Sequence, residues 1–299
     1  MAFGAALCSA LWVAAIAAAP AGPDVAIVVS SHAGAFESAL HAAEVELGPR
    51  AQVLDLSALD AAAAASVLAR SPAKVVLAIG PQSADFALAD AAKRPVVHCL
   101  LPNAQRRGMD QPGVRGVPLT VEVKQVVAAI RGALPRARRA TVVFDPAESG
   151  AAAIKAELEA RGAGITLRKQ EISRGTEVSA ALTAAFTDSD VVWLLPDRAV
   201  SSSEALRFVI LQSFERKIPV VVSFEAHARQ GALMAVVPDP VAHGRAAARL
   251  ARVIADGTPP AKIAAPETGA LVIVNLRTAR RLSIDIPDDF TSKAASVIK

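Results

Sequence analysis

Short apolar runs alternate with longer amphipathic stretches from residue 24 onward. The runs are typical of buried strands and the stretches of helices. The predicted strands form two sets, Val25–Ser30, Gln52–Leu56, Val75–Ile79 and Val96–Leu100, then Thr141–Phe144, Ile165–Ile172, Val191–Leu195 and Val220–Phe224. The predicted helices between them are Ala35–Leu47, Ala58–Ala69 and Ser83–Ala92, then Ala151–Arg161, Glu177–Phe186 and Ser202–Arg216. Such alternation predicts an α/β fold with parallel sheets and right-handed crossovers.

The two sets of strands follow the same plan. Lys93-Arg-Pro-Val-Val begins the last strand of the first set, and Lys217-Ile-Pro-Val-Val begins the last strand of the second. The third strand of each set runs into a loop with Pro and Ser and then a helix. We therefore predict two similar doubly wound lobes, with Val117–Thr120 as the first connection and Val121–Leu134 as the opening helix of the second lobe.

The last quarter of the chain adds a strand, an amphipathic helix, a second strand and a short helix. The first strand starts at Gly231-Ala-Leu-Met-Ala-Val, the helix spans residues 244–257, and the second strand starts at Leu271. A tail of this kind can pass back between two completed lobes and hinge them. Hinged lobes imply a cleft that closes on a ligand.

The N-terminus has the pattern of an export signal. Residues 1–23 contain no charged side chain, and Ala19-Pro-Ala fits a cleavage site with small residues. We predict a signal peptide over residues 1–21 and a periplasmic mature protein; an uncleaved membrane anchor and lipidation of Cys8 are the alternatives. Without residues 1–21, Cys99 is the only cysteine, so no internal disulfide is expected.

Composition and motifs argue against several classes of function. The formal net charge is +4, and the basic clusters, such as Arg106-Arg107, are not interleaved with the aromatic residues that single-strand binders use. We expect no nucleic-acid partner. His98 and Cys99 are neighbours on a strand, so their side chains point to opposite faces. Because the histidines lack metal-ligand spacing and no nucleophile elbow or phosphate loop occurs, we expect no catalytic residues, metal or cofactor.

Polar residues gather where the predicted strands end. Ligands of open parallel sheets bind at the carboxyl ends of the strands. The candidate ligand-binding residues there are Ser31, His32, Gly80, Gln82, Ser83, Asp145, Ser149, Asp197, Ser201, Ser202, Ser223 and Glu225. Helix N-termini at these loops favour a carboxylate, and Asp145, Asp197 and Glu225 could meet an ammonium group. An amino acid or small peptide-like solute would fit. Each residue also has a structural alternative, since Ser83, Ser149 and Ser201 are common helix caps.

The chain resembles a known family in the order of its motifs. The matching pieces are Gly231-Ala-Leu-Met-Ala-Val, Gly244 with its Ala-rich helix, Val274-Asn-Leu-Arg-Thr-Ala, Val75–Ser83, Phe144-Asp-Pro, Pro196–Ser203 and Lys217–Ser223. They resemble the ABC-transporter periplasmic substrate-binding proteins of the tryptophan- and tyrosine-binding type.

That resemblance implies a type I periplasmic binding fold, or Venus-flytrap, with three hinge crossings. Lobe one would take residues 24–118 and 236–269, and lobe two residues 119–235 and 270–299. It implies a monomer that binds a small solute and delivers it to an ABC permease in the inner membrane. The positions it brings nearest the ligand are Gly80, Gln82, Ser83, Asp145, Asp197, Ser201, Ser223 and Asp239.

The chain also departs from that family's pattern. Pro238-Asp-Pro stands where the family often has an acidic residue followed by tyrosines, and residues 98–103 and 196–198 replace other usual loops. The identity of the ligand, and whether the site still binds one, therefore stay open. A periplasmic module that signals to a membrane sensor would need the same closing cleft. An enzyme on the same fold is a third reading.

Overall fold

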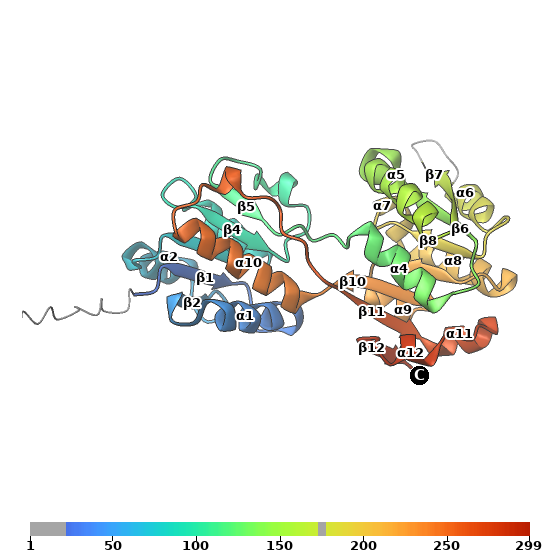
Figure 1. The fold of residues 1–299 in the computed structure, drawn as a ribbon. Helices are drawn as coiled ribbons and strands as arrows, with labels where there is room; N and C mark the ends of the chain where they lie inside the picture. The colour runs from blue at the N-terminus through green and yellow to red at the C-terminus, as the bar shows by residue number, and fades with distance from the viewer. Residues whose placement is uncertain (1–21, 173–177) are drawn as a thin grey trace, which may run out of the picture.

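The structure is a computed structural model that describes residues 22–172 and 178–299. The predicted signal peptide, residues 1–21, lies outside the described residues, and the side chains of Ala199 and Ser201 are not described either. Figure 1 shows two α/β lobes joined by extended segments of chain. Within the described residues, no helix combines the length and the apolar character needed to cross a bilayer.

Lobe one is built on a five-stranded parallel sheet with the order β2-β1-β3-β4-β5. Its strands are β1 (Val25–Val29), β2 (Ala51–Asp55), β3 (Val75–Ile79), β4 (Val96–Cys99) and β5 (Val114–Gly116). Its helices are α1 (Gly34–Leu47), α2 (Ala61–Arg70), α3 (Pro81–Leu88) and the short η1 (Gly48–Arg50) and η2 (Ala104–Arg107). Helices cover both faces, so every residue of β1 and β3 is buried, which explains their unbroken apolar sequence.

Lobe two is built on a seven-stranded sheet with the order β12-β11-β10-β9-β8-β6-β7. Its strands are β6 (Arg139–Phe144), β7 (Thr166–Glu171), β8 (Val191–Leu194), β9 (Val220–Val222), β10 (Met234–Pro238), β11 (Ala270–Asn275) and β12 (Ser296–Ile298). Its helices are α4 (Val123–Ala133), α5 (Pro146–Gly162), α6 (Val178–Ala185), α7 (Arg198–Ser201), α8 (Ser203–Arg216), α9 (Glu225–Arg229), α11 (Leu276–Leu282) and α12 (Asp288–Thr291).

The first five strands of each lobe are arranged in the same way. Numbered within its own lobe, each set has the order 2-1-3-4-5, because β7-β6-β8-β9-β10 repeats β2-β1-β3-β4-β5. The strand order reverses between β1 and β3 in lobe one and between β6 and β8 in lobe two. These are the topological switch points at which such sheets bind ligands. The predicted pair of doubly wound lobes is confirmed.

Each lobe is completed by a helix that follows the fifth strand of the other lobe. Helix α4 follows β5 but packs against α5, and α10 (Pro240–Ala255) follows β10 but packs against α1. The α1–α10 contact is close: a Cβ on Gly244 would lie 2.1 Å from the carbonyl oxygen of Ala39. Only glycine permits this approach, so Gly244 anchors α10 to lobe one.

Strand β11 adds one antiparallel pairing to the lobe-two sheet. It runs antiparallel to β10, with Pro238 opposite Ala270. The chain leaves lobe two at Pro238, forms α10 and the short η3 (Pro260–Lys262), and returns beside the point where it left. A strand that starts where its neighbour ends must run the other way. The sequence assigned residues 236–269 to lobe one, whereas β10 stays paired in the lobe-two sheet through Pro238.

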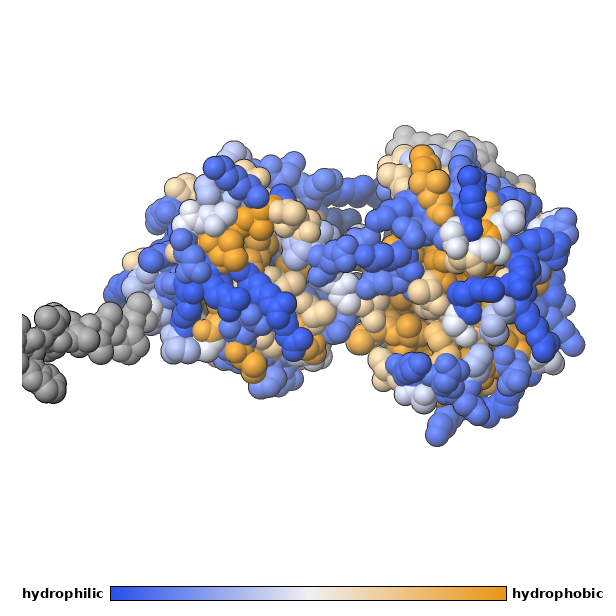
Figure 2. Space-filling view, in the orientation of Figure 1, coloured by the Kyte–Doolittle hydropathy of each residue, from blue (hydrophilic) through white to orange (hydrophobic). Residues whose placement is uncertain are grey.

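The strand order also fixes which ends of the sheets face each other. Strands β5 and β10 both leave their sheets at the carboxyl end and run directly into a crossing between the lobes. Their parallel neighbours point the same way. The carboxyl ends of both sheets, with the loops that follow them, therefore face the opposite lobe. Figure 2 shows the surface narrowing and hollowed between the lobes.

Hydrogen bonds tie the first crossing to the second. The imidazole of His243, on α10, is fully buried. Its Nδ1 lies 2.8 Å from the carbonyl oxygen of Asp239 on the second crossing, and its Nε2 lies 3.1 Å from that of Pro118 on the first. One side chain therefore links two of the three segments that join the lobes.

The third crossing is fastened to the second and to α4. The backbone N–H of Asp239 donates to the carbonyl of Gly269 at 3.1 Å, and Gln125 Nε2 donates to the carbonyl of Thr268 at 2.9 Å. Gln125 also accepts from the backbone N–H of Glu122, which completes a capping box at the start of α4. The three crossings thus form one hydrogen-bonded hinge.

Candidate functional site

The switch point of lobe one is closed by two serine hydroxyls. Ser30 follows β1 and Ser83 lies in the first turn of α3, and both are buried. Ser30 Oγ accepts from the backbone N–H of Ser83 at 3.0 Å and lies 3.2 Å from its hydroxyl. Ser83 Oγ donates to the carbonyl of Gly80 at 3.0 Å. The hydroxyl of Ser83, which was predicted to contact a ligand, is therefore used in an uncharged hydrogen-bonded bridge between the two loops.

Gly80 gives this bridge its room. Its φ of +95° and ψ of 175° belong to a region that essentially only glycine visits. A Cβ there would lie 2.8 Å from Ser30 Oγ and 3.0 Å from the ring of Phe36. The absence of a side chain at Gly80 therefore leaves room for the bridge between Ser30 and Ser83.

The other predicted residues of lobe one lie at the rim of the same edge. Gln82 is exposed, Ser31 is half-buried, and His32 is exposed. His32 Nε2 lies 3.5 Å from a carboxylate oxygen of Asp55, at the end of β2. All three side chains are at least partly exposed to solvent.

A buried carboxylate closes the switch point of lobe two. Asp197 follows β8 and is 1% exposed. Its Oδ2 accepts from the backbone N–H of Asp145 at 2.6 Å, and its Oδ1 accepts from the hydroxyl of Ser149. Burial raises the pKa of Asp197, although both hydrogen bonds oppose the shift. Asp197 therefore holds the loop after β6 against the loop after β8.

The same contact shapes the start of α5. Asp145 caps this helix by accepting from the backbone N–H of Ala147 at 2.8 Å. Ser149, held by Asp197, has φ −129° and ψ 17° and so interrupts the helix one turn after its start. The first turn, which contains Glu148, is thereby set apart from the rest of α5. Asp145, Ser149 and Asp197, which were predicted to contact a ligand, lie close together. Their contacts are hydrogen bonds to one another.

Glu148 lies at the edge of lobe two that faces lobe one, and the sequence reading did not single it out. Its carboxylate accepts from Arg198 at both the backbone N–H, at 3.0 Å, and Nε, at 2.6 Å. The backbone N–H of Arg198 is the main cause of a lowered Glu148 pKa. Arg106, from η2 of lobe one, brings its Nη2 within 4.0 Å of the same carboxylate. This ion pair spans the two lobes and shows that their strand-end loops face each other.

The remaining predicted residues of lobe two have separate roles. Ser202 caps α8 by accepting from Ala205 N, Glu225 pairs with Arg229, and Asp239 caps α10 by accepting from the N–H groups of Val241 and Ala242. Asp239 belongs to the hinge and is not grouped with the switch-point loops. The side chain of Ser201 lies outside the described part of the structure.

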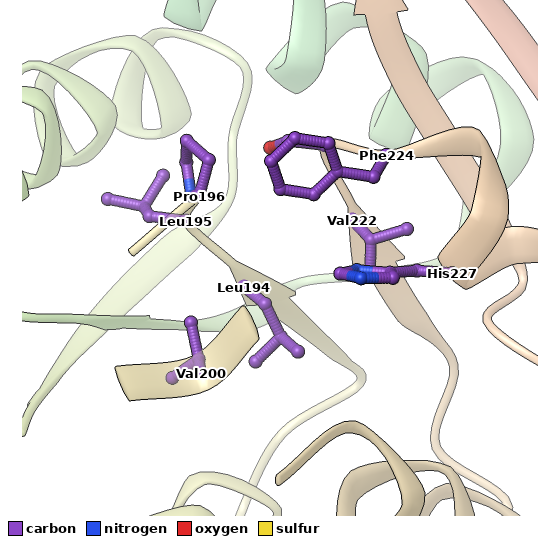
Figure 3. Close-up of a pocket in the computed structure, with 8 residues that line it drawn as sticks. Leu194, Leu195, Pro196, Val200, Val222, Phe224 and His227 are labelled. Carbon is purple, nitrogen blue, oxygen red and sulfur yellow. The ribbon is translucent and has the colours of Figure 1, made fainter. Parts of the chain in front are cut away.

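Ser223 lines a small hollow at the carboxyl ends of β8 and β9. The hollow has room for about one water molecule, and its wall is made by Leu194, Leu195, Pro196, Val200, Val222, Ser223, Phe224 and His227. Figure 3 shows Pro196 and Phe224 over these strand ends. Phe224 is 45% exposed, and its ring meets that of His227 edge-on with 5.2 Å between centroids. The sequence reading placed Phe224 inside a predicted strand, so only the structure shows that its ring is exposed.

The Asn-Leu-Arg-Thr-Ala motif of the tail lies away from these loops. Asn275 and Thr278 are both buried in lobe two. Asn275 caps α11 by accepting from Thr278 N and donates to the carbonyl of Ala228, while Thr278 Oγ1 donates to that of Gly231. The motif fastens the last helix to the sheet and makes no contribution to the cleft.

Comparison with known proteins decides the family. A sequence model described as ABC transporter substrate binding protein matches residues 30–298. The chain belongs to this family. No curated protein sequence matches this substrate-binding protein. The match and the structural neighbours together confirm the type I periplasmic binding fold.

Solved structures resemble this substrate-binding protein over most of its length. One is the ligand-free, open structure of CD0873, a substrate-binding protein with adhesive properties from Clostridium difficile, with a TM-score of 0.66, 17% identity, and coverage of 92% of this chain and 99% of that one. Another is an ABC domain in complex with L-Trp from Streptococcus pneumonia, with a TM-score of 0.55, 18% identity, and coverage of 92% and 100%. A conserved domain protein from Vibrio cholerae has a TM-score of 0.53, 21% identity, and coverage of 93% and 100%.

The family gives a solute-binding role to this chain. Within residues 22–172 and 178–299, no group of three or more His, Cys, Asp or Glu side chains is placed to hold a metal ion.

Proposed function

We propose that this protein is the periplasmic receptor of an ABC import system, which captures a small polar solute between its lobes and delivers it to a membrane permease. The observation that carries the proposal is the arrangement of the two lobes. Their switch points, at which open parallel sheets bind ligands, face each other across the hinge, and Arg106 of lobe one lies 4.0 Å from Glu148 of lobe two. A solute that touches both edges would bind the closed arrangement better than the open one and shift the equilibrium toward it.

The mechanism depends on the lobes moving as units. Buried ties close each switch point, Ser30 to Ser83 in lobe one and Asp197 to Ser149 in lobe two, so the loops are held in place before a solute arrives. Rotation would then take place at the three crossings, whose ends are fixed by His243 and by the bond between Asp239 and Gly269. Such hinge closure is the usual response of two-lobed receptors to a solute. A permease would recognise the closed form.

The exposed residues of both edges are proposed to contact the solute. In lobe one these are His32 and Gln82 with the half-buried Ser31, and in lobe two Phe224 with the half-buried Ser223. Gly80, Ser83, Asp145, Ser149, Asp197 and Ser202 would act mainly by holding the loops in position. We propose that the protein releases its solute unchanged.

A thermal-shift screen against small solutes, followed by small-angle scattering, tests this function. A solute at about 100 times its Kd adds about 2.7 kcal/mol to the free energy of unfolding, which gives a readily measured rise in Tm. The same solute should reduce the radius of gyration. The matched variant is Phe224→Ser, which should weaken binding while leaving Tm of the free protein nearly unchanged. If no solute raises Tm or compacts the protein, solute capture is refuted; turnover of any solute would refute the transport role.

A further inference from the structure

We propose that Arg106 of lobe one and Glu148 of lobe two form a latch across the cleft, an ion pair that favours the closed arrangement of the lobes before a solute binds. This inference rests on the proposed function and names two positioning residues that set how readily the cleft closes. Neither residue belongs to the hinge, since Arg106 lies in η2, after β4, and Glu148 lies in α5, after β6.

Glu148 is the fixed partner of this pair. It lies in the first turn of α5, which the non-helical Ser149 separates from the rest of the helix, and its side chain is only 21% exposed. Its carboxylate accepts from the backbone N–H of Arg198 at 3.0 Å and from Nε of the same residue at 2.6 Å. Exposed ion pairs are weak partly because two flexible side chains must be ordered. Here one of the two is already held by its own lobe.

Arg106 is the reaching partner, and it stands on a turn that is fastened to lobe one. Asn103 and Gly108, on either side of η2, have left-handed backbone conformations, with φ of 54° and 74°. Arg107, in the same turn, pairs with Asp85 of α3 at 2.7 Å. The backbone of the turn therefore moves with lobe one, whereas the side chain of Arg106 is 63% exposed and can extend across the cleft.

The separation of the two charges gives the latch its direction. Arg106 Nη2 lies 4.0 Å from the carboxylate of Glu148, which is the outer limit of an ion pair. Coulomb attraction grows as the distance falls. Movement that brings the two edges together therefore strengthens the pair, and movement apart breaks it. Because an exposed pair contributes little energy, the latch biases the equilibrium between open and closed forms without locking the cleft.

Pulsed electron paramagnetic resonance on the solute-free chain can measure the separation of the lobes. Spin labels are attached through Leu59→Cys, after β2, and Ala226→Cys, after β9, two exposed positions on the facing edges. Cys8→Ser removes the cysteine of the leader, and Cys99 is buried and stays unlabelled. The readout is the ratio of short to long distances between the two labels, which reports the closed and open arrangements.

Removing either charge should shift this labelled protein toward the open arrangement. We expect the ratio of short to long distances to fall about threefold in Arg106→Gln and in Glu148→Gln, and no further in the double variant, because one interaction is lost in all three. Salt at about 1 M should lower the ratio of the wild type in the same way and leave the variants unchanged. Arg106→Lys keeps the positive charge and should retain most of the short distances.

Two matched controls separate the latch from local effects of the substitutions. Arg107→Gln changes the same turn but a pair within lobe one, so the ratio should match the wild type. Arg198→Gln removes the other arginine from the carboxylate of Glu148 and leaves Arg106 in place, so the ratio should stay equal or rise.

Three results would overturn the latch. These are an unchanged or higher ratio in both Arg106→Gln and Glu148→Gln, a further fall in the double variant, and an equal fall in Arg198→Gln, which would place the effect at the start of α5. Because no solute is added, such a failure leaves the receptor function to be decided by the solute screen.

Discussion

The two lobes solve the same structural problem with different chemistry. Each must hold two loops together at a switch point, on the edge that faces the other lobe. Lobe one uses the neutral hydroxyls of Ser30 and Ser83 beneath Gly80, whereas lobe two uses the buried carboxylate of Asp197. Equal strand orders do not require equal contacts, because backbone geometry fixes where the loops meet but not which side chains join them.

Two buried titratable groups, one in each lobe, have pKa values that burial shifts in opposite directions. Lobe one contains His98, on β4, whose pKa burial lowers to about 4. Lobe two contains Asp197, whose pKa burial raises. A buried base resists taking up a proton, and a buried acid resists losing one. Acidification should therefore remove stability through His98 but not through Asp197, and this contrast can be tested from several directions.

The largest expected effect is a loss of stability in acid that depends on His98. Because its folded pKa is below the ordinary value of 6.5, the stability it contributes is complete above pH 6.5 and is lost as the pH falls toward 4. A shift of this size corresponds to about 3 kcal/mol. Urea unfolding from pH 7 to pH 4 should show this loss in wild type and a much smaller one in His98→Gln. Parallel pH profiles of the two proteins would contradict the assignment.

Trp193 allows the lobes to be followed separately in the same experiment. It lies on β8, and it is the only tryptophan within residues 22–299. In a Trp12→Phe background its fluorescence reports lobe two, while circular dichroism reports both lobes. Because His98 lies in lobe one, we expect His98→Gln to shift the acid transition of the dichroism more than that of the fluorescence. Simultaneous transitions would mean that the lobes unfold as one unit.

Replacing Asp197 should have the next largest effect, because two donors lose their acceptor. Asp197→Ala leaves the N–H of Asp145 and the hydroxyl of Ser149 without the partners they have now, at a cost of about 2–3 kcal/mol. Asp197→Asn can still accept from Asp145 and donate to Ser149, so it should cost less than about 1 kcal/mol. Urea denaturation at pH 7 separates the two variants. Equal losses would show that charge, not hydrogen bonding, holds the lobe-two loops.

Gly80→Ala tests how tightly the lobe-one bridge is built. The substitution combines a backbone conformation rare for alanine with a Cβ 2.8 Å from Ser30 Oγ, and we expect a loss of about 2 kcal/mol. Gly34→Ala is the matched control, since its φ is also positive, at +53°, but no atom lies within 4 Å of the added Cβ. It should cost about 1 kcal/mol. Thermal melts of both variants measure the two losses of stability. Equal losses would show that crowding of the added Cβ against Ser30 Oγ does not destabilise the protein.

The smallest effect is expected for the hydroxyl bridge itself. Ser83→Ala removes the bond to the carbonyl of Gly80 and the contact with Ser30, which should cost about 1 kcal/mol. Ser38→Ala, which removes an exposed bond to Gly34, should change stability by less than about 0.5 kcal/mol. A larger loss of stability in Ser83→Ala than in Asp197→Ala would show that the lobe-one bridge stabilises the fold more than the lobe-two bridge does.

Much of the fold was predictable because it depends on local pattern. The apolar runs became buried strands, such as β1 and β3, since helices on both faces require apolar residues throughout. Gly231 and the Ala-rich helix after Gly244 correctly indicated a tail that passes between lobes. The short elements β5, β12 and α9 were missed, because three to five residues carry too little periodicity to be recognised.

The sequence by itself determined the two α/β lobes, the edge at which a ligand would lie, and the residues concentrated there. Only the tertiary structure decided which of those residues are free. Ser83, Asp145, Ser149 and Asp197 look alike in sequence as polar residues after strands. Ser83 bonds to Ser30, and Asp145 and Ser149 both bond to Asp197, so these residues position the loops. Arg106 and Glu148 lie 42 positions apart and meet only because the hinge places the lobes face to face. Pairings between distant segments depend on packing, and no local pattern records them.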